Sequence, residues 1–275
     1  MLAAAKKATG KLIIKDKTLN NYKETIMRNI NDYTTTYKQS DFESIQVKYR
    51  RKKVLEQINK FESKRILEIG CGLEPLFSFY DKFEKYIIVE PSKEFYENAV
   101  KLAKSDNRIK CFKDYFGKDF IQNKYDDLKS LKFDLIVCSS LLHEIEDVTS
   151  FLESLKKICS KDTVVHINVP NSRSLHRLLA KHIGLIKDEH QMSERNILLQ
   201  QQRVFDLDSL SKVLNEAGFK ILDKGSYFIK PFTHAQMEKL IESGICDDKM
   251  LDGFFSLVDD LPEYGSEIYA NCKIL

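Results

Sequence analysis

Short apolar runs recur along the chain at a regular pitch, and amphipathic stretches separate them. Five of these runs have the length and residue types of buried strands. They lie at about 65–69, 86–90, 109–113, 133–138 and 163–169. Helical patterns fall at about 43–60, 92–104 and 148–159, and Pro75 stands where a further helix would begin. This alternation predicts crossover units and a parallel sheet.

The regular alternation stops after Asn171. Residues 171–206 contain no clear strand and resemble helical pieces inserted into the fold. Beyond them, Asp206 has the residue type of a helix cap, and Gly218 is typical of a helix end. The remaining elements are expected as a helix at about 207–217, a strand at about 219–229, a helical segment at about 233–258 and a strand at about 266–274.

Composition indicates one globular domain with an N-terminal extension. Of the 275 residues, 43% are hydrophobic and 31% are charged, which suits a buried core beneath a polar surface. Residues 1–44 are polar and rich in Lys, Asn and Thr. We therefore expect an arm over 1–44 and a single domain over 45–275, with the insertion at 171–206 as part of that domain.

Charge and hydropathy argue against several classes of partner. The net charge of +3 is too small to indicate a nucleic-acid-binding protein. No apolar run is long enough to span a bilayer, and the first residues make a poor signal peptide. The six cysteines show no CxxC spacing, which is typical of free thiols in a reducing cytoplasm and argues against zinc. We expect a cytoplasmic protein without a membrane, nucleic-acid or metal partner.

Two glycines and two acids mark a candidate cofactor site. Gly70 and Gly72 follow the first strand, and Glu90 ends the second. A parallel sheet holds a nucleoside in this way, with a glycine turn after one strand and a carboxylate for the ribose hydroxyls after the next. A dinucleotide motif would need a third glycine where this chain has Pro75, and Glu68 would repel a pyrophosphate. S-adenosylmethionine carries an amino group, a sulfonium and no phosphate, so these residues favour that cofactor.

Several motifs in order make the chain resemble a class I S-adenosylmethionine-dependent methyltransferase over about 45–230. The run 68–72, with Cys71 between its glycines, matches the first motif of that family. Glu90, followed by Pro91, matches the ribose-binding acid. One departure is Glu74, where the family often has another glycine.

Two later segments extend the resemblance. Asp114 and Tyr115 fall where the family contacts the adenine, and Ser139 and Ser140 lie in the run that lines its methionine moiety and active site. The resemblance implies an α/β, Rossmann-like fold with a seven-stranded, mostly parallel sheet, an antiparallel last strand, helices on both faces and a helical lid at 171–206. It also implies S-adenosyl-L-methionine as cofactor and S-adenosyl-L-homocysteine as product.

The helix before the first strand often closes over the cofactor in this family. Tyr49 and Arg51 on that helix are therefore candidates for contact with the methionine carboxylate. The alternative is a plain amphipathic helix with no role in cofactor binding.

His143 is the candidate catalytic base. It follows the fourth strand at the carboxyl edge of the sheet, where ligands bind, and Glu144 lies beside it. Methyl transfer to a hydroxyl requires loss of the hydroxyl proton, which a histidine commonly accepts. The alternative is that His143 only supports the loop. We expect Glu144, and Asn171 at the tip of the fifth strand, to contact the acceptor.

The insertion at 171–206 is expected to hang over the mouth of the active site. Its segment 172–182 has a helical pattern in which Arg173, Arg177 and Lys181 recur every fourth residue and form one basic face. His176 lies beside that face, and His190 follows in a polar stretch. A basic lid suits an anionic acceptor, such as a nucleotide-linked sugar or a phosphorylated metabolite. A solvated face on a packing helix is the alternative.

The lid and its flanks are similar, more loosely, to ubiquinone-pathway O-methyltransferases and to relatives among surface-polysaccharide biosynthesis enzymes. The segments 168–171, 174–178 and 204–207 carry this resemblance. We therefore predict O-methyl transfer to a small, anionic acceptor. A methyltransferase of RNA or protein and a non-catalytic cofactor-binding regulator are the alternatives. The run 138–141 lacks the Asn/Asp-Pro-Pro-aromatic pattern of base or glutamine N-methylation.

Overall fold

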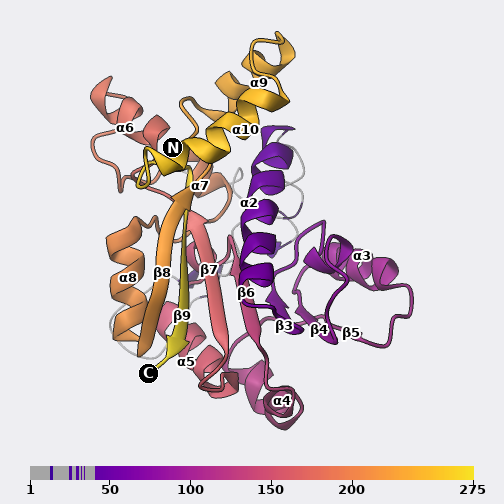
Figure 1. Ribbon diagram of the computed structural model, residues 1–275. Coiled ribbons are helices and arrows are strands. Elements are labelled where there is room, and N and C mark those ends of the chain that lie inside the picture. The colour runs from indigo at the N-terminus through magenta and orange to yellow at the C-terminus, as the bar shows by residue number, and fades with distance from the viewer. Residues whose placement is uncertain (1–12, 15–24, 27–28, 31, 33, 35–40) are drawn as a thin grey trace, which may run out of the picture.

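The computed structural model describes residues 13–14, 25–26, 29–30, 32, 34 and 41–275 (Figure 1). Most of the expected N-terminal arm therefore lies outside the described residues. Within it, β1 (Ile13–Ile14) and β2 (Thr25–Ile26) pair in antiparallel fashion. The rest of the described chain is a layered α/β fold.

Seven strands form one sheet in the order β5-β4-β3-β6-β7-β9-β8. The neighbours from β5 to β7 are parallel, whereas β9 runs antiparallel to both β7 and β8. The strands are β3 (Arg65–Ile69), β4 (Lys85–Val89), β5 (Ile109–Phe112), β6 (Leu135–Ser139), β7 (Val164–Pro170), β8 (Phe219–Tyr227) and β9 (Glu267–Ile274). This arrangement confirms the predicted Rossmann-like sheet with an antiparallel last strand.

Helices cover both faces of the sheet (Figure 1). Buried apolar side chains of α4, α5 and α8 pack on one face, and those of α2 and α3 pack on the other. These helices are α2 (Asp41–Lys60), α3 (Lys93–Ala103), α4 (Lys118–Ser130), α5 (Val148–Ile158) and α8 (Leu207–Glu216).

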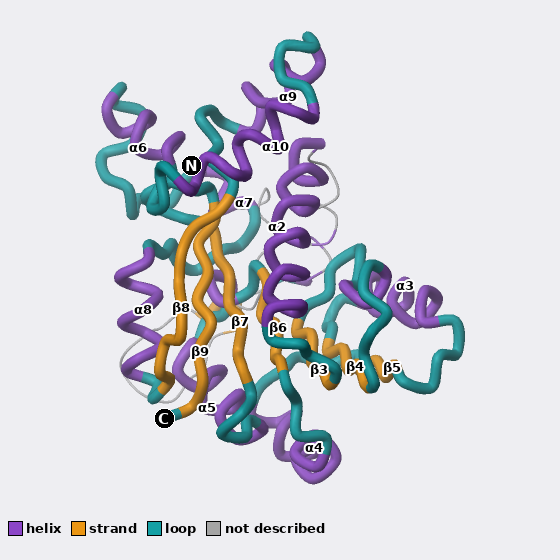
Figure 2. Tube along the Cα trace, in the orientation of Figure 1, coloured by secondary structure: helices purple, strands orange, loops and turns teal. Residues whose placement is uncertain are grey.

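Further helices gather beyond the carboxyl ends of the parallel strands (Figure 2). This helical cap consists of α6 (Leu175–His182), α7 (Glu194–Leu198), α9 (His234–Glu242) and α10 (Asp248–Ser256). The first half of α2 belongs to the same apolar cluster as the cap, because Phe42 and Tyr49 are buried there with Phe228, Met237 and Phe255. The cap therefore stands over the edge of the sheet where the strand-end residues lie.

The structure differs from the expected elements in three places. Pro75 precedes a single 3₁₀ turn, η1 (Leu76–Ser78), and no α-helix. Helix α4 has no counterpart among the expected elements, since only Phe120, Ile121 and Leu128 of its thirteen residues are buried and its apolar stripe is thin. The expected helix at 233–258 is two helices, because the turn at Gly244 takes a φ of +73°.

Within the described residues, no helix is long and apolar enough to cross a membrane. The same residues contain no group of three His, Cys, Asp or Glu side chains placed to hold a metal ion. All six cysteines are free thiols, and five of them are buried.

Candidate active site

The loop after β3 builds one wall of a cavity at the carboxyl edge of the sheet. Gly70 and Gly72 have φ angles of +77° and +59°, a region that strains residues with side chains and favours glycine. This turn brings the backbone N–H of Gly72 to 3.4 Å from Glu90 Oε2. We call this space the glycine-loop cavity. Its lining includes Glu68, Gly70, Cys71, Gly72, Glu90, Pro91, Ser139 and Ser140.

Glu68 is a buried acid that borders this cavity. Its Oε2 accepts hydrogen bonds from the Tyr86 hydroxyl at 2.8 Å and from the Leu76 N–H at 3.2 Å. Burial raises the pKa of Glu68 to about 8, against the opposing effect of these two hydrogen bonds. Glu68 therefore joins β3, β4 and η1 and also presents a carboxyl group to the cavity.

Glu90 is the second buried acid of the cavity. Its carboxylate accepts hydrogen bonds from the backbone N–H groups of Ser92 at 2.8 Å and Gly72 at 3.4 Å. Burial raises its pKa to about 7, although these N–H groups act in the opposite direction. Two acids with raised pKa values favour a positively charged ligand, because a nearby cation stabilises the ionised carboxylates.

Helix α2 contributes Arg51, but not Tyr49, to the glycine-loop cavity. Arg51 borders the cavity and pairs with Glu74, the residue that departs from the family pattern. Tyr49 is fully buried, stacks on Phe228 at 4.5 Å between ring centroids, and places its hydroxyl 3.0 Å from Asp252 Oδ1. Tyr49 therefore does not border this cavity, and its expected contact with the cofactor stays a prediction. Residues two positions apart on an α-helix differ by about 200° in direction around the helix axis, so the side chains of Tyr49 and Arg51 face different surroundings.

A second cavity adjoins the first and shares Gly70 and Pro91 with it. Tyr115 and Phe116 border this aromatic cavity, which suits a flat ring such as adenine. Asp114 is exposed and borders neither cavity. Its Oδ1 accepts the backbone N–H of Tyr115 at 2.8 Å, so it shapes the turn. The expected contact between Asp114 and the adenine stays a prediction, because Asp114 borders neither cavity in this structure.

A third cavity, the cap cavity, lies between the sheet edge and the helical cap. Its volume is about 140 Å³, which is roughly ten times the space that one water molecule needs. The cap cavity shares Arg50, Ser140 and Glu144 with the glycine-loop cavity. The two cavities therefore meet at these three side chains.

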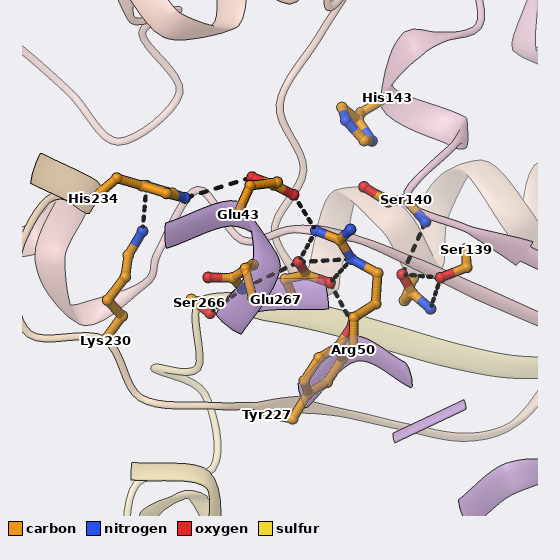
Figure 3. Close-up of polar contacts among 12 residues, drawn as sticks. Glu43, Arg50, Ser139, Ser140, His143, Tyr227, Lys230, His234, Ser266 and Glu267 are labelled. Atoms are coloured by element: carbon orange, nitrogen blue, oxygen red, sulfur yellow. Dashed lines mark hydrogen bonds and ion pairs between the residues drawn. The ribbon is translucent and has the colours of Figure 1, made fainter. Parts of the chain in front are cut away.

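The turn after β6 lies at this border. Ser140 has a φ of +52°, an uncommon backbone conformation for a residue with a side chain. Its backbone N–H donates to Asn168 Oδ1 at 2.9 Å, and Asn168 Nδ2 donates to Ser139 Oγ at 3.0 Å (Figure 3). Asn168, on β7, thus holds the expected serines in place at the junction.

His143 reaches the cap cavity from η2 (Leu142–Glu144), the 3₁₀ turn that follows. Its side chain is 2% exposed, and its Nε2 lies 3.8 Å from Glu144 Oε1. The backbone carbonyl of His143 accepts the Gln202 N–H at 2.9 Å, which ties this turn to the segment after α7. The structure thus places His143 and Glu144 together beside the junction of the two cavities.

A buried ion-pair network lines the cap cavity (Figure 3). Arg50 Nε donates to both carboxylate oxygens of Glu267, at 2.9 and 3.0 Å. The Tyr227 hydroxyl donates to the same carboxylate, and Arg50 Nη2 lies 3.3 Å from Glu43 Oε1. No motif in the sequence marks these residues as part of a site. Their one local signal is the spacing of Glu43 and Arg50, two turns apart on the same face of α2.

Lys230 and His234 continue this network (Figure 3). Lys230 Nζ donates to His234 Nδ1 at 2.9 Å, and His234 Nε2 lies 3.7 Å from Glu43 Oε2. Burial lowers the pKa of Lys230 to about 7 and the pKa of His234 to about 4. Both side chains border the cap cavity, and the sequence analysis identifies neither.

Three of the expected lid and strand-tip residues border the cap cavity, namely Asn171, His176 and Arg177. Asn171 Nδ2 donates to the Gly265 carbonyl at 2.8 Å. Arg177 Nη2 donates to the backbone carbonyls of Glu189 at 2.8 Å and Gln191 at 2.6 Å. Arg177 therefore holds the loop after α6 in place, and part of the Arg177 side chain also borders the cap cavity.

The other two expected lid residues lie outside the cap cavity, and their contact with an acceptor stays a prediction. Arg173 precedes α6, so it does not share a helical face with Arg177, and it borders a separate small cleft beside Asp206. His190 is exposed, and its Nε2 lies 3.0 Å from Asp206 Oδ2. The expected basic stripe is therefore divided, because the helix begins later than its charge pattern indicates.

Comparison with known proteins identifies one family. Residues 44–224 match the model of the methyltransferase domain family. No curated protein matches the chain.

Among similar solved structures is the Burkholderia thailandensis 1,6-didemethyltoxoflavin-N1-methyltransferase with bound 1,6-didemethyltoxoflavin and S-adenosylhomocysteine. It has 11% identity and a TM-score of 0.53 over 96% of this chain and 94% of its own. The plantazolicin methyltransferase BamL, in complex with a triazolic desmethylPZN analogue and S-adenosylhomocysteine, has 14% identity and a TM-score of 0.53 over 88% and 94%. A putative S-adenosylmethionine-dependent methyltransferase from Listeria monocytogenes has 10% identity and a TM-score of 0.53 over 84% and 99%. These likenesses agree with the fold described above.

Proposed function

Because the chain belongs to the methyltransferase domain family, we propose that it transfers a methyl group from S-adenosyl-L-methionine to a hydroxyl group of a small, anionic acceptor. The observation that carries this proposal is the meeting of the glycine-loop and cap cavities at Arg50, Ser140 and Glu144. Separate spaces with a common border suit in-line transfer between two bound molecules. We take 45–275 as the methyltransferase domain and 171–206 as its lid.

The cofactor is S-adenosyl-L-methionine, and the residues of the glycine-loop cavity fit it. Two buried carboxyl groups with raised pKa values, Glu68 and Glu90, suit a ligand that carries an ammonium and a sulfonium. In our proposal Glu90 holds the ribose hydroxyls, Tyr115 borders the adenine, and Arg51 reaches the carboxylate. These assignments supply a polar site for each end of the cofactor.

His143 is the general base in this proposal. When bound, the cofactor would supply a methyl group activated by its sulfonium: the acceptor oxygen would bond to the methyl carbon, the bond from carbon to sulfur would break, and S-adenosyl-L-homocysteine would leave as the thioether. His143 takes the hydroxyl proton as that oxygen attacks, and Glu144, at 3.8 Å from Nε2, stabilises the resulting imidazolium. Asn168 holds the backbone at Ser140 and so fixes the border across which the methyl group passes.

Two observations support the choice of acceptor. The cap cavity is lined by Arg177 and Lys230, which form no ion pair with a carboxylate among the described residues, and this favours an anionic molecule. The looser sequence resemblance to ubiquinone-pathway and surface-polysaccharide O-methyltransferases supports a hydroxyl group. The Burkholderia thailandensis neighbour is named as an N1-methyltransferase, so nitrogen acceptors belong in the test.

The direct test measures S-adenosylhomocysteine formation with a panel of small acceptors. The panel pairs hydroxy acids and sugar phosphates with their uncharged analogues and with amines of similar size. We expect turnover with hydroxylated anions and a mass increase of one methyl group on oxygen. Methylation of amines alone, or of RNA or protein in place of the panel, would overturn the acceptor assignment. Absence of S-adenosylhomocysteine binding in calorimetry would overturn the cofactor site itself.

A further inference from the structure

Lys230 is a buried cation with no carboxylate beside it. It is 2% exposed, and its Nζ makes a hydrogen bond to the neutral ring of His234 at 2.9 Å. Across the part of the chain that the structure describes, no carboxylate oxygen lies within 4.0 Å of Nζ. A buried ammonium without a counter-ion is costly. The cavity that it borders is where a counter-ion would enter.

Basic groups surround this end of the cap cavity. His176 lines its wall, and the buried Nδ1 atom of His176 has no hydrogen-bond partner among the described residues. Burial first, and then Lys230, His234 and Arg177, hold the pKa of His176 well below its usual range. The neighbours of His176 are therefore basic groups, and the site lacks the negative charge that would balance them.

The acids nearest to this site are already paired. Glu43 lies 3.0 Å from Arg195 Nη2 and 3.3 Å from Arg50 Nη2. Glu267 is held by Arg50 and by the Tyr227 hydroxyl. Both acids raise the pKa of Lys230 from a distance, but burial and Arg195 act against them. Neither carboxylate is placed to neutralise the ammonium directly.

We propose that Lys230 and His176 form an oxyanion subsite at the lid end of the cap cavity, which binds a carboxylate or phosphate group of the acceptor. Lys230 supplies the charge, and the ring of His176 supplies a hydrogen bond from Nδ1 in the tautomer that carries the proton there. His234 orients Lys230, because its Nδ1 accepts one of the three ammonium protons. This inference rests on the proposed function for its acceptor, and it assigns the anionic group of that acceptor to named residues.

A different role for Lys230, as a second general base, makes the opposite prediction. A base must lose its proton, so its contribution to turnover would rise as the pH increases through 7. An oxyanion subsite needs the protonated ammonium, so anion affinity falls over the same range.

The groups that face Lys230 are His234 of α9, His176 and Arg177 of α6, Glu43 and Arg50 of α2, Arg195 of α7 and Glu267 of β9. Both histidines have lowered pKa values, so neither adds a charge above pH 7.

The experiment uses the full chain and inorganic sulfate as probe, since sulfate keeps a constant charge between pH 6 and 9. Sulfate affinity is measured by calorimetry for the wild type, Lys230→Met and the control Lys224→Met. Lys224 is exposed on β8, and its Nζ contacts Ser211. We expect Lys230→Met to weaken sulfate binding at least tenfold at pH 6.5, with less than a twofold change in Lys224→Met. Acetate in place of sulfate then shows whether the subsite prefers a carboxylate or a phosphate-like group.

Two results would overturn the subsite. One is equal sulfate affinity in the wild type and Lys230→Met; the other is wild-type affinity that does not fall between pH 6.5 and 8.5. Since the second measurement needs no variant, a folding defect in Lys230→Met leaves the test intact. Binding of S-adenosylhomocysteine is measured in the same samples. If that binding is normal while sulfate binding fails, the subsite is wrong and the proposed methyltransferase site stands; the reverse result rejects the cofactor site alone.

Discussion

At the level of single residues, the two acids of the glycine-loop cavity differ from surface carboxylates because they are buried. Glu68 and Glu90 are each 3% exposed, and burial raises both pKa values, to about 8 and about 7. A bound cation would lower these values again, because it stabilises the carboxylates. Cofactor binding should therefore release protons near neutral pH.

Replacement of Glu90 tests its role at the ribose. We expect Glu90→Ala to weaken S-adenosylhomocysteine binding by about 1.5–3 kcal/mol, the usual contribution of hydrogen bonds to a charged group. Calorimetry measures this change. Glu153→Ala is the matched control, because Glu153 is an exposed glutamate on α5 that borders none of the three cavities. Unchanged affinity in Glu90→Ala, or an equal loss in Glu153→Ala, would contradict the assignment.

The pH dependence of cofactor binding follows from the same raised pKa values. Between pH 6 and 8 the free protein binds more protons at Glu68 and Glu90 than the complex does, so affinity rises with pH through this window. Calorimetry in buffers of different ionisation enthalpy measures the released protons. A flat profile would show that the two carboxyl groups keep their protonation state when the cofactor binds.

His143 is the residue on which the chemical step is proposed to depend. We expect His143→Gln to lower kcat by about 10²–10⁴, the range for loss of a general base, with little change in cofactor affinity. His190→Gln is the control, since His190 is exposed and borders neither the glycine-loop nor the cap cavity. Wild-type turnover in His143→Gln would reduce this histidine to support of the loop.

At the scale of elements, helix α6 separates two arginines that the sequence pattern groups together. The helix begins at Leu175, so Arg177 borders the cap cavity while Arg173 lies before the helix beside another cleft. Arg177 also holds the loop after α6 through the carbonyls of Glu189 and Gln191. The segment after β7 is thus a helix and a loop that the guanidinium group of Arg177 holds together.

The two arginines should therefore respond differently to charge reversal. We expect Arg177→Glu to raise the apparent KM for an anionic acceptor by about tenfold or more, since a like charge would face the acceptor and the loop would lose its fastening. Arg173→Glu should change KM less than twofold. Steady-state kinetics at fixed cofactor concentration decides between them. Equal effects of both variants would restore the single basic stripe.

Element boundaries were predictable where local chemistry is strong. The bounds of the strands that end at or just before Gly70, Glu90 and Ser139 agree with the predicted bounds to within one or two residues. Each of these strands is a short apolar run that ends at the edge of a buried sheet. Helix α4 was missed, since packing of three apolar side chains holds a helix that is otherwise polar. Tertiary contact decides such elements more than their own pattern does.

At the scale of the whole molecule, buried charge lies between the sheet and the helical cap. Lys230 has a folded-state pKa of about 7 against the ordinary value of 10.5, because burial disfavours the ammonium. The folded protein therefore binds fewer protons than the unfolded chain between these two pH values. Above pH 10.5 the side chain is neutral in both states and does not lower the free energy of unfolding. That free energy decreases as the pH drops from 10.5 to about 7, and it stays at the lower value below pH 7.

Because the buried ammonium of Lys230 lowers the free energy of unfolding, a variant without this charge is expected to be more stable. We expect Lys230→Met to raise the free energy of unfolding at pH 6.5 by about 3–5 kcal/mol, since each unit of pKa shift corresponds to about 1.4 kcal/mol. The gain should shrink toward pH 10.5. Urea unfolding at several pH values measures it, with Lys224→Met as the exposed control. Destabilisation at low pH in Lys230→Met would mean that the ammonium is already neutralised within the folded protein.

The spacing of apolar runs, glycines and acids along the chain predicts both the sheet, which is confirmed, and the cofactor side of the candidate site. Gly70, Gly72, Glu68 and Glu90 act close to the strand ends that carry them, so their spacing along the chain already encodes their spacing in the fold. His143 and Glu144 follow for the same reason, because they come directly after β6.

The other side of the candidate site depends on contacts between segments that are far apart in the chain. Arg50 pairs with Glu267, which lies 217 positions further along the chain. Lys230 lies just after β8 and borders the cap cavity. Nothing in the sequence around Lys230 separates a buried lysine from an exposed one. Burial and counter-charge are properties of distant segments that come together, and they give Lys230 its lowered pKa and these residues their proposed roles.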